Sequence, residues 1–258
     1  MAILETKNLT YTYGAGTPFE KTAVENVNLS VEKGAFVGVI GHTGSGKSTL
    51  IQMLNGLIRP TSGQVLLNGE DIWAKPKEIR RVRFQVGMVF QYPEYQLFEE
   101  TIAKDIAFGP KNQGLSEEEI DQRVRRAMAH VHLDYDKYAE RSPFDLSGGQ
   151  MRRVAIAGVL AMEPKVLILD DSTSAVDTAT DAKIRHSFAE KIPGTTVFII
   201  AQRISSVENA DKVLVLDNGR VSGFDTPANL LKTNAIYQDV YNSQTKGSGD
   251  FDEKGGEA

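Results

Sequence analysis

The sequence contains no cysteine, which excludes disulfide bonds, cysteine-ligated zinc sites and cysteine nucleophiles. It also lacks any apolar run as long as the ~20 residues that a helix needs to cross a bilayer. Its longest apolar runs are short segments such as Val166–Leu169 and Val197–Ala201. Met1–Leu4 is too short for a signal peptide and has no basic start. Basic charge is not in excess, because 29 Lys and Arg face 34 Asp and Glu, which argues against a partner such as bulk nucleic acid. We therefore expect a soluble cytosolic protein that reaches a membrane only through partners.

The composition is that of a folded protein, with 41% apolar and 24% charged residues among 258. This excludes a wholly disordered, collagenous or coiled-coil chain. Short β-branched apolar runs predict strands, and apolar residues at helical spacing predict helices. The expected strands are Phe36–Ile40, Val65–Leu67 with an Asn68-Gly69 turn, Val166–Leu169, Val197–Ile200, and Val213–Leu216 with an Asn218-Gly219 turn. Four helices are expected: one after Gly46 with apolar positions Leu50, Leu54, Leu57 and Ile58, one that begins at Ser116, one from about Gly149 to Met162, and one from Asp177 to Ile192.

The middle of the chain differs from its ends, because strand patterns are absent from about 92 to 162. Ser116 and Glu119 predict a capping box at the start of a helix. That helix has an apolar face made of Ile120, Val124, Ala127, Met128 and Val131. Because strands resume after this part, we predict one α/β domain over 1–246 with a helical subdomain inserted near 92–162, and a disordered tail at 247–258.

A glycine-rich loop stands between a predicted strand and a predicted helix. Residues 41–48, Gly-His-Thr-Gly-Ser-Gly-Lys-Ser, match the pattern G-x-x-x-x-G-K-[ST]. Its glycines let backbone N–H groups turn toward phosphate oxygens, and the helix N-terminus adds positive potential. Lys47 supplies a cation for the β- and γ-phosphates, and Ser48 supplies a hydroxyl to Mg²⁺. The alternative is a glycine turn with a solvated lysine, but the context favours a nucleotide site formed by Gly41, Thr43, Gly44, Ser45, Gly46, Lys47, Ser48 and Thr49.

A second motif, Leu-Ser-Gly-Gly-Gln at residues 146–150, opens a predicted helix. Alone it is most simply a helix N-cap made by Ser147, with glycines that leave amides open to an anion. It lies about 100 residues after the phosphate loop and about 20 before a strand that ends in Asp170. With this spacing, residues 3–245 resemble the ATP-binding cassette (ABC) ATPases, whose signature is LSGGQ. The resemblance implies a P-loop NTPase fold with a RecA-like α/β core, an antiparallel β subdomain and a helical subdomain.

The same resemblance implies roles for further residues, with ATP and Mg²⁺ as cofactors. Tyr13 resembles the aromatic that stacks on adenine, and Tyr11 is its competitor. Gln91 resembles the Q-loop glutamine, and Asp170 resembles the Walker B aspartate; with Ser48 they are the expected Mg²⁺ ligands. In this family two cassettes pack head to tail. The ATP of one chain would therefore contact the signature residues Ser147, Gly148, Gly149 and Gln150 of the other.

Two positions depart from the family pattern. The residue after the Walker B aspartate is usually glutamate but here is Asp171, whose carboxylate reaches roughly 1–1.5 Å less far, and misplacement on that scale costs about 100-fold in rate. The switch histidine is replaced by Gln202, whose amide can donate a hydrogen bond but has no positive charge. With Gln91, these are the expected catalytic positions. We expect a site that holds ATP and hydrolyses it slowly; tolerated substitution is the alternative.

The two parts of the chain resemble different subfamilies. Residues 1 to about 165 resemble the ATPase of energy-coupling factor (ECF) importers, in the segments Leu9–Gly14, Gln91–Phe98 and Ile106–Pro110. From about Asp170 the chain resembles the degenerate cassette of a heterodimeric ABC exporter, in the segments Asp171–Thr178, Ala201–Ser205 and Tyr237–Gln244. A recombinant or engineered chain would explain this mosaic, and ordinary divergence is the alternative.

The resemblance implies the ATPase subunit of an ABC transporter, of the ECF type that imports micronutrients. It would lie peripherally at the cytoplasmic face of the cell membrane. Its partners would be a second ABC ATPase subunit, in a homo- or heterodimer, and integral membrane subunits. The alternatives are the degenerate nucleotide-binding domain of an exporter and a non-transport ABC protein. The latter class carries two cassettes in one chain or long heptad insertions, and this sequence has neither.

Overall fold

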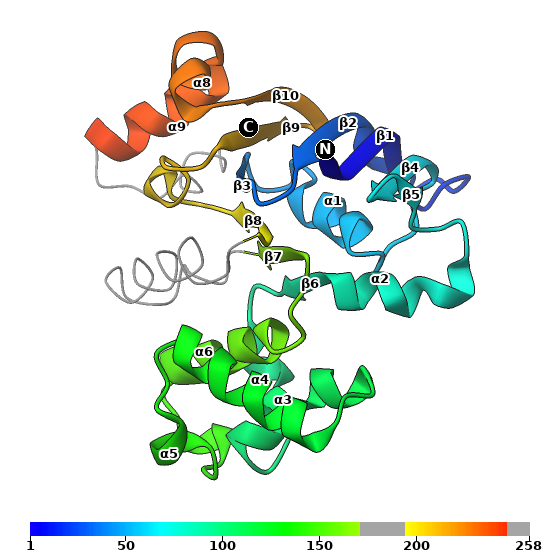
Figure 1. Ribbon diagram of the computed structural model, residues 1–258. Coiled ribbons are helices and arrows are strands. Elements are labelled where there is room, and N and C mark those ends of the chain that lie inside the picture. The colour runs from blue at the N-terminus through cyan, green and yellow to red at the C-terminus, as the bar shows by residue number, and fades with distance from the viewer. Residues whose placement is uncertain (171–193, 247–258) are drawn as a thin grey trace. The chain divides into compact units, whose positions relative to one another are not determined.

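The computed structural model describes residues 1–170 and 194–246 (Figure 1). The chain divides into two compact units, one formed by Met1–Arg83 with Thr196–Ala258 and the other by Phe84–Thr195. The expected helix from Asp177 to Ile192 and the expected disordered tail lie outside the described residues.

An antiparallel sheet occupies the start of the first unit, in the strand order β2-β1-β4-β5. Its strands are β1 (Ala2–Tyr13), β2 (Lys21–Glu32), β4 (Ser62–Leu67) and β5 (Glu70–Asp71). Leu67 pairs with Glu70 across the turn made by Asn68 and Gly69, both of which have positive φ. The hairpin predicted from this Asn-Gly pair is therefore confirmed.

The first unit also holds a mostly parallel set of strands with β3 at its centre. These strands are β3 (Phe36–Ile40), β8 (Thr196–Ile200), β9 (Lys212–Asp217) and β10 (Arg220–Asp225). β3 pairs in parallel with β8 on one side and with β9 on the other, while β10 is antiparallel to β9. The near-continuous apolar runs of β3, β8 and β9 are buried, as expected for strands covered on both faces, whereas β10 is partly exposed.

Helix α1 (Lys47–Leu54) follows β3 through the glycine loop. The sequence predicted apolar helical positions as far as Ile58, but the helix ends four residues earlier. Gly56 has a φ of 73°, a left-handed conformation that terminates a helix, and Leu57 beyond it is 39% exposed. The other helical segments of this unit are η1 (Pro76–Glu78), α2 (Ile79–Gln85, which reaches the unit boundary), η4 (Ile204–Ser206), α8 (Pro227–Thr233) and α9 (Ala235–Lys246).

The second unit combines two parallel strands with a group of helices. Strand β6 (Val86–Val89) pairs with β7 (Val166–Asp170). Between them lie η2 (Pro93–Gln96), α3 (Ile102–Asn112), α4 (Glu117–His130), α5 (Tyr135–Tyr138), η3 (Pro143–Asp145) and α6 (Gly148–Leu160). Helices α3, α4 and α6 pack against one another (Figure 1). The expectation that residues 92–162 are helical is confirmed.

Helix α4 begins where the sequence predicts, but its capping box is only half formed. The Ser116 hydroxyl accepts a bond from the Glu119 N–H at 3.3 Å. The Glu119 carboxylate does not return to Ser116, because it pairs with Arg123 at 2.8 Å. The five predicted apolar positions of this helix and its C-cap, from Ile120 to Val131, are all buried.

Candidate functional site

The phosphate loop lies between β3 and α1, in the strand–loop–helix order that its motif requires. The Lys47 ammonium donates to the carbonyl oxygens of Gly41 at 2.6 Å and His42 at 2.9 Å, so the cation sits over the loop's own backbone. Thr43, Gly44 and Ser48 are exposed, while Ser45 and Thr49 are buried. This arrangement places one cation beside the first turn of α1, which suits an anion.

Two glycines of the loop are fixed by the backbone around them. A Cβ at Gly41 would overlap the Leu216 carbonyl oxygen, and a Cβ at Gly46 would overlap that of Ala23. Gly46 also has a φ of 98°, which L side chains rarely adopt. A Cβ at Gly44, in contrast, would meet nothing within 4 Å. The loop is therefore tightly seated on its inner side and open on its outer side.

The turn between β9 and β10 also supports the loop through backbone hydrogen bonds. The Gly219 N–H donates to the Ser45 carbonyl at 3.0 Å, and the Glu25 N–H donates to the Gly219 carbonyl at 2.8 Å. The Ser45 hydroxyl is buried without a hydrogen-bond partner within the described chain. The loop thus depends on strands from both sheets of the first unit for its conformation.

Tyr13, at the end of β1, lies beside the helix that follows the loop. Its hydroxyl is 3.1 Å from the Thr49 Oγ1, and 44% of the residue is exposed. Tyr11 packs edge-to-face against the Tyr13 ring, with the centroids 4.8 Å apart. Tyr13 is thus the aromatic in hydrogen-bond contact with α1, and Tyr11 supports its ring.

The motif at residues 146–150 forms a complete capping box at the start of α6. The Gln150 N–H donates to the Ser147 Oγ at 3.4 Å, and the Ser147 N–H donates to the Gln150 Oε1 at 3.0 Å. The Gln150 Nε2 donates to the Tyr138 hydroxyl at 3.2 Å. A Cβ on Gly148 or Gly149 would meet nothing within 4 Å, so this helix start is sterically open.

Two more predicted residues belong to the second unit. Asp170 ends β7 and is 8% exposed. Gln91 follows β6 and is exposed, and its carbonyl accepts a 2.6 Å bond from the Arg152 guanidinium. Arg152 is 2% exposed, so this bond ties the segment after β6 to α6.

Gln202 belongs to the first unit and begins just after β8. The Ala201 N–H donates to the Val39 carbonyl at 3.0 Å, which extends the β3–β8 pairing to the residue before Gln202. The carboxyl ends of parallel neighbours meet at one edge of a sheet. Gln202 therefore lies at the edge where β3 enters the phosphate loop. Asp171, its expected catalytic companion, falls outside the described residues.

Within residues 1–170 and 194–246, no group of three or more His, Asp or Glu side chains is arranged to hold a metal ion. The predicted Mg²⁺ ligands include a single carboxylate, that of Asp170, with Ser48 and Gln91. Such a donor set suits Mg²⁺ only when phosphate oxygens and water complete its octahedron.

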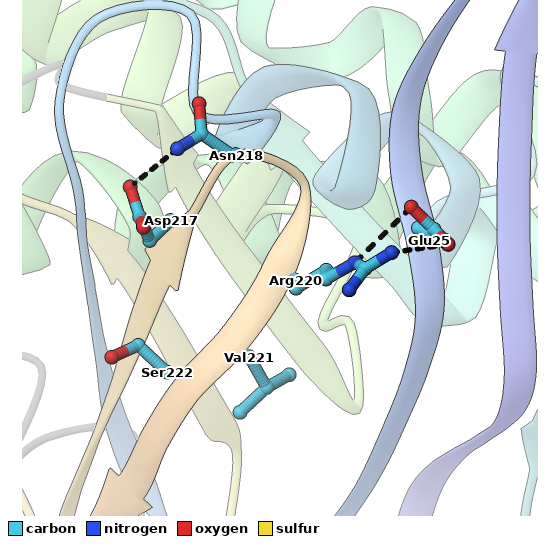
Figure 2. A pocket seen from close by; sticks show the side chains of 6 residues that line it. All are labelled: Glu25, Asp217, Asn218, Arg220, Val221 and Ser222. Carbon is cyan, nitrogen blue, oxygen red and sulfur yellow. Dashed lines mark hydrogen bonds and ion pairs between the residues drawn. The ribbon is translucent and has the colours of Figure 1, made fainter.

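A pocket of about 470 Å³ lies beside the β9–β10 turn (Figure 2), lined by Glu25, Asp217, Asn218, Arg220, Val221 and Ser222. The Arg220 guanidinium forms an ion pair with both Glu25 oxygens, and the Asn218 amide donates to Asp217 at 3.2 Å (Figure 2). None of these lining residues belongs to the predicted nucleotide set. Arg220 and Glu25 already pair with each other, and Asp217 already accepts from Asn218, so we assign the pocket no ligand.

Three polar contacts around these residues were not predicted from the sequence. Arg152 lies four positions before Ile156 on the buried side of α6, and a basic residue at such a position is a usable signal. Tyr138 and Gln244, in contrast, reach their partners from separate elements. Nothing in their local sequence distinguishes them from surface residues.

The family model described as "ABC transporter" matches residues 24–174. The chain is 53% identical over 220 residues to the "Energy-coupling factor transporter ATP-binding protein EcfA2" of Clostridium acetobutylicum, which covers 84% of this chain and 77% of the relative. The aligned segment of 220 residues is longer than the first 165 residues, to which the sequence analysis confined the ECF resemblance. Similarity to an ECF protein therefore extends beyond the first part of the chain. The comparison gives no support to a chimeric origin.

Two solved structures are similar to the whole fold. One is the structure of cbiO1 from Clostridium perfringens, part of the ABC transporter complex cbiONQ, with a TM-score of 0.80, 35% identity and coverage of 95% of this chain and 96% of that one. The other is the dimeric ATP-binding cassette MJ0796 in a post-hydrolysis state with ADP and Pi, with a TM-score of 0.77, 30% identity and coverage of 86% and 98%.

Proposed function

Since this chain belongs to the ABC transporter ATPases, and among them to the ATP-binding proteins of energy-coupling factor transporters, we propose that it couples ATP binding at residues 41–49 to micronutrient import. The family binds and hydrolyses ATP. The observation that carries the proposal is the Lys47 ammonium, held at the first turn of α1 over a loop whose outer side is open.

The nucleotide contacts follow from the chemistry of the loop. Backbone N–H groups of Gly44 and Gly46 would bind phosphate oxygens, and Lys47 would exchange its carbonyl partners for the β- and γ-phosphates. Among the residues that the structure describes, the buried hydroxyl of Ser45 has no partner that would compete with a ligand. Tyr13 presents an exposed ring beside Thr49, which suits stacking on a base.

Mg²⁺ would be held by Ser48, Asp170 and Gln91, and it would neutralise charge on the β- and γ-phosphates. The hydroxyl, the carboxylate and the amide are all oxygen donors, as Mg²⁺ prefers. The family match, which runs through residues 24–174, supports one nucleotide-binding domain over 1–246 that includes both units.

A membrane subunit is the proposed partner of the segment that follows Gln91. Tyr92, Tyr95 and Phe98 in this segment are 55%, 84% and 57% exposed, and Phe108 of α3 packs edge-to-face on Phe98. Exposed aromatics this dense mark an interaction surface. No helix that the structure describes is long and apolar enough to cross a membrane. We therefore propose a peripheral subunit at the cytoplasmic face, attached through integral membrane partners.

A second ATPase subunit is the other proposed partner. Ser147 and Gly148 are exposed and Gly149 is half-buried at the N-terminus of α6, which suits contact with the phosphates of ATP held by another chain. The similar MJ0796 cassette is dimeric. We propose a head-to-tail dimer in which each ATP lies between the phosphate loop of one chain and the signature of the other.

We further propose that this chain holds ATP well and hydrolyses it slowly. Asp171 and Gln202 stand where the family usually has glutamate and histidine, while Lys47 and Asp170 match the pattern. A chain of this kind would need a competent partner for full activity.

Calorimetry with Lys47→Ala tests the nucleotide site. The variant loses the cation of the loop, so its affinity for Mg-ATP should fall by about one to two orders of magnitude, as expected for a charge-assisted contact. Lys33→Ala is the matched control, because Lys33 is an exposed lysine of the same unit. Equal ATP affinities in the wild type and Lys47→Ala would contradict the site. Thermal unfolding of both variants checks that the loop remains folded.

A further inference from the structure

The side-chain amide of Gln244, near the end of α9, bonds both polar groups of a distant backbone segment. Its Nε2 donates to the Gln202 carbonyl at 2.7 Å, and its Oε1 accepts from the Ile204 N–H at 2.7 Å. The partners lie 42 and 40 positions away in the sequence. One planar amide therefore fixes the backbone on both sides of Arg203.

The segment that Gln244 holds is the one that carries Gln202 to the edge of the sheet. Ala201 is bonded to β3, but the strand pairing ends there, and the next turn is the short helix η4. The N-cap position of η4, Arg203, makes no side-chain capping bond. Gln244 supplies that missing acceptor from another element. Gln202 thus lies between one anchor on the sheet and one on α9.

Helix α9 is itself a fixed support. The Asn234 Nδ2 donates to the carbonyl and hydroxyl oxygens of Ser222 at 3.1 and 3.0 Å, which ties the start of α9 to β10. Tyr237 and Val240 on its inner face are each 2% exposed. Because the first turn and one face of the helix are fixed, its last turns also keep a fixed position relative to the sheet. The position of Gln244 is therefore set by the sheet of the first unit.

We propose that Gln244 is a positioning residue for the γ-phosphate, which acts by holding the Gln202 backbone at the edge of the phosphate loop. This inference rests on the proposed function, since it assumes that Gln202 faces the γ-phosphate of bound ATP. Loss of the amide would let residues 201–204 move while the loop itself stays seated. ATP should then lose its advantage over ADP, because only ATP has a γ-phosphate.

The test compares Gln244→Met with Gln238→Met in the full-length chain. Methionine keeps the length of glutamine and removes both hydrogen-bonding groups. Gln238 is the matched control, because it is a glutamine of the same helix whose Nε2 donates only to the nearby Leu231 carbonyl at 2.9 Å. Three quantities are measured: hydrogen exchange in the peptide 201–206 without nucleotide, the ATP and ADP dissociation constants, and kcat with KM for phosphate release.

Gln244→Met should raise exchange in residues 201–206 by about tenfold and leave the peptide 41–48 unchanged. The ratio of ADP to ATP dissociation constants and kcat should each fall about three- to tenfold, and KM should rise with the ATP dissociation constant because hydrolysis is slow, while ADP affinity stays within about twofold of wild type. Gln238→Met should match wild type in all three. If Gln244→Met also lowers the thermal midpoint, Gln244→Glu, which keeps the acceptor for Ile204, replaces it.

Wild-type exchange in Gln244→Met would overturn the contact. Faster exchange with an unchanged ratio of dissociation constants and unchanged kcat would leave Gln244 a purely structural residue and overturn the positioning role. Failure of the wild type to bind ATP is a separate result: it contradicts the proposed function, and with it the positioning role, whatever the exchange shows.

Discussion

Two single residues separate binding of ATP from its cleavage in the function we propose. In that proposal Lys47 and the loop around it would hold a nucleotide without help from Asp171 or Gln202. Cleavage needs a placed water and charge near the γ-phosphate. A shorter carboxylate and an uncharged amide weaken both. Interactions that act only in the transition state change kcat with little effect on affinity.

Restoring glutamate and histidine together should therefore raise the rate. We expect Asp171→Glu with Gln202→His to increase kcat about 10- to 1000-fold, with ATP affinity nearly unchanged. Steady-state phosphate release from the wild type, both single variants and the double variant measures this, under conditions where dimers form.

The double variant should gain more than either single one, because both groups act on the same phosphate. A wild type that already turns over at about 1 per second or faster, with no gain in the double variant, would show that Asp171 and Gln202 are competent substitutes.

At this scale the sequence predicted the residues that belong to contiguous motifs. The eight positions of the phosphate loop and the signature were found by pattern, and the structure gives them helix starts and an open face. Gln244 and Arg152 could not be found in this way. Their roles come from hydrogen bonds that link positions 40 or more residues apart, and a single sequence does not encode which positions meet.

At the scale of elements, the signature depends on a neighbouring helix. The Gln150 side chain holds Ser147 through its oxygen and Tyr138 through its nitrogen. Tyr138 belongs to α5, whose other tyrosine, Tyr135, donates to Asp121 at 3.1 Å instead. The two tyrosines thus have comparable hydroxyl contacts, of which only one involves the signature.

Tyr138→Phe should lower turnover about fivefold, the effect of one lost neutral hydrogen bond. ATP affinity should stay within about twofold of wild type, because a chain binds ATP with its own phosphate loop. Tyr135→Phe serves as the control and should match wild type in both measurements. Phosphate release and calorimetry together decide the matter: identical turnover in the two phenylalanine variants would contradict a role for α5 in holding the signature.

Element types were predicted better than element ends. The buried strands and the helical character of residues 92–162 follow from apolar periodicity, which the core enforces. The end of α1 was missed because Gly56 adopts a left-handed conformation that the apolar pattern through Ile58 does not reveal. The half-formed box at Ser116 was missed because Arg123 competes for the Glu119 carboxylate. Such endings are decided by local competition between contacts of similar strength.

At the scale of the whole molecule, a head-to-tail dimer makes a complementation prediction. A chain with Lys47→Ala lacks a phosphate site but keeps its signature, and a chain with Ser147→Arg has the reverse defect. Each should be inactive alone. Mixed in equal amounts, half of the dimers combine the two chains and have one intact site of two, so about a quarter of the unmodified activity should return.

Phosphate release in the background of Asp171→Glu and Gln202→His gives the necessary signal. The matched controls are samples of the Lys47→Ala chain alone and of the Ser147→Arg chain alone, each at the same total concentration as the mixture. No recovery in the mixture, with dimers present by light scattering, would exclude a site shared between two chains.

The close fit of Gly41 and Gly46 against the Leu216 and Ala23 carbonyls has a consequence for the descent of this gene. Any side chain at either position would strike main-chain atoms, so selection for a folded product preserves both glycines even in a lineage that no longer uses nucleotide. Thr43 and Ser48 are exposed and lack this constraint. In descendants of this chain, substitutions at Thr43 and Ser48 would therefore indicate that the reaction has been lost. Conservation of the two glycines would indicate only that the protein still folds.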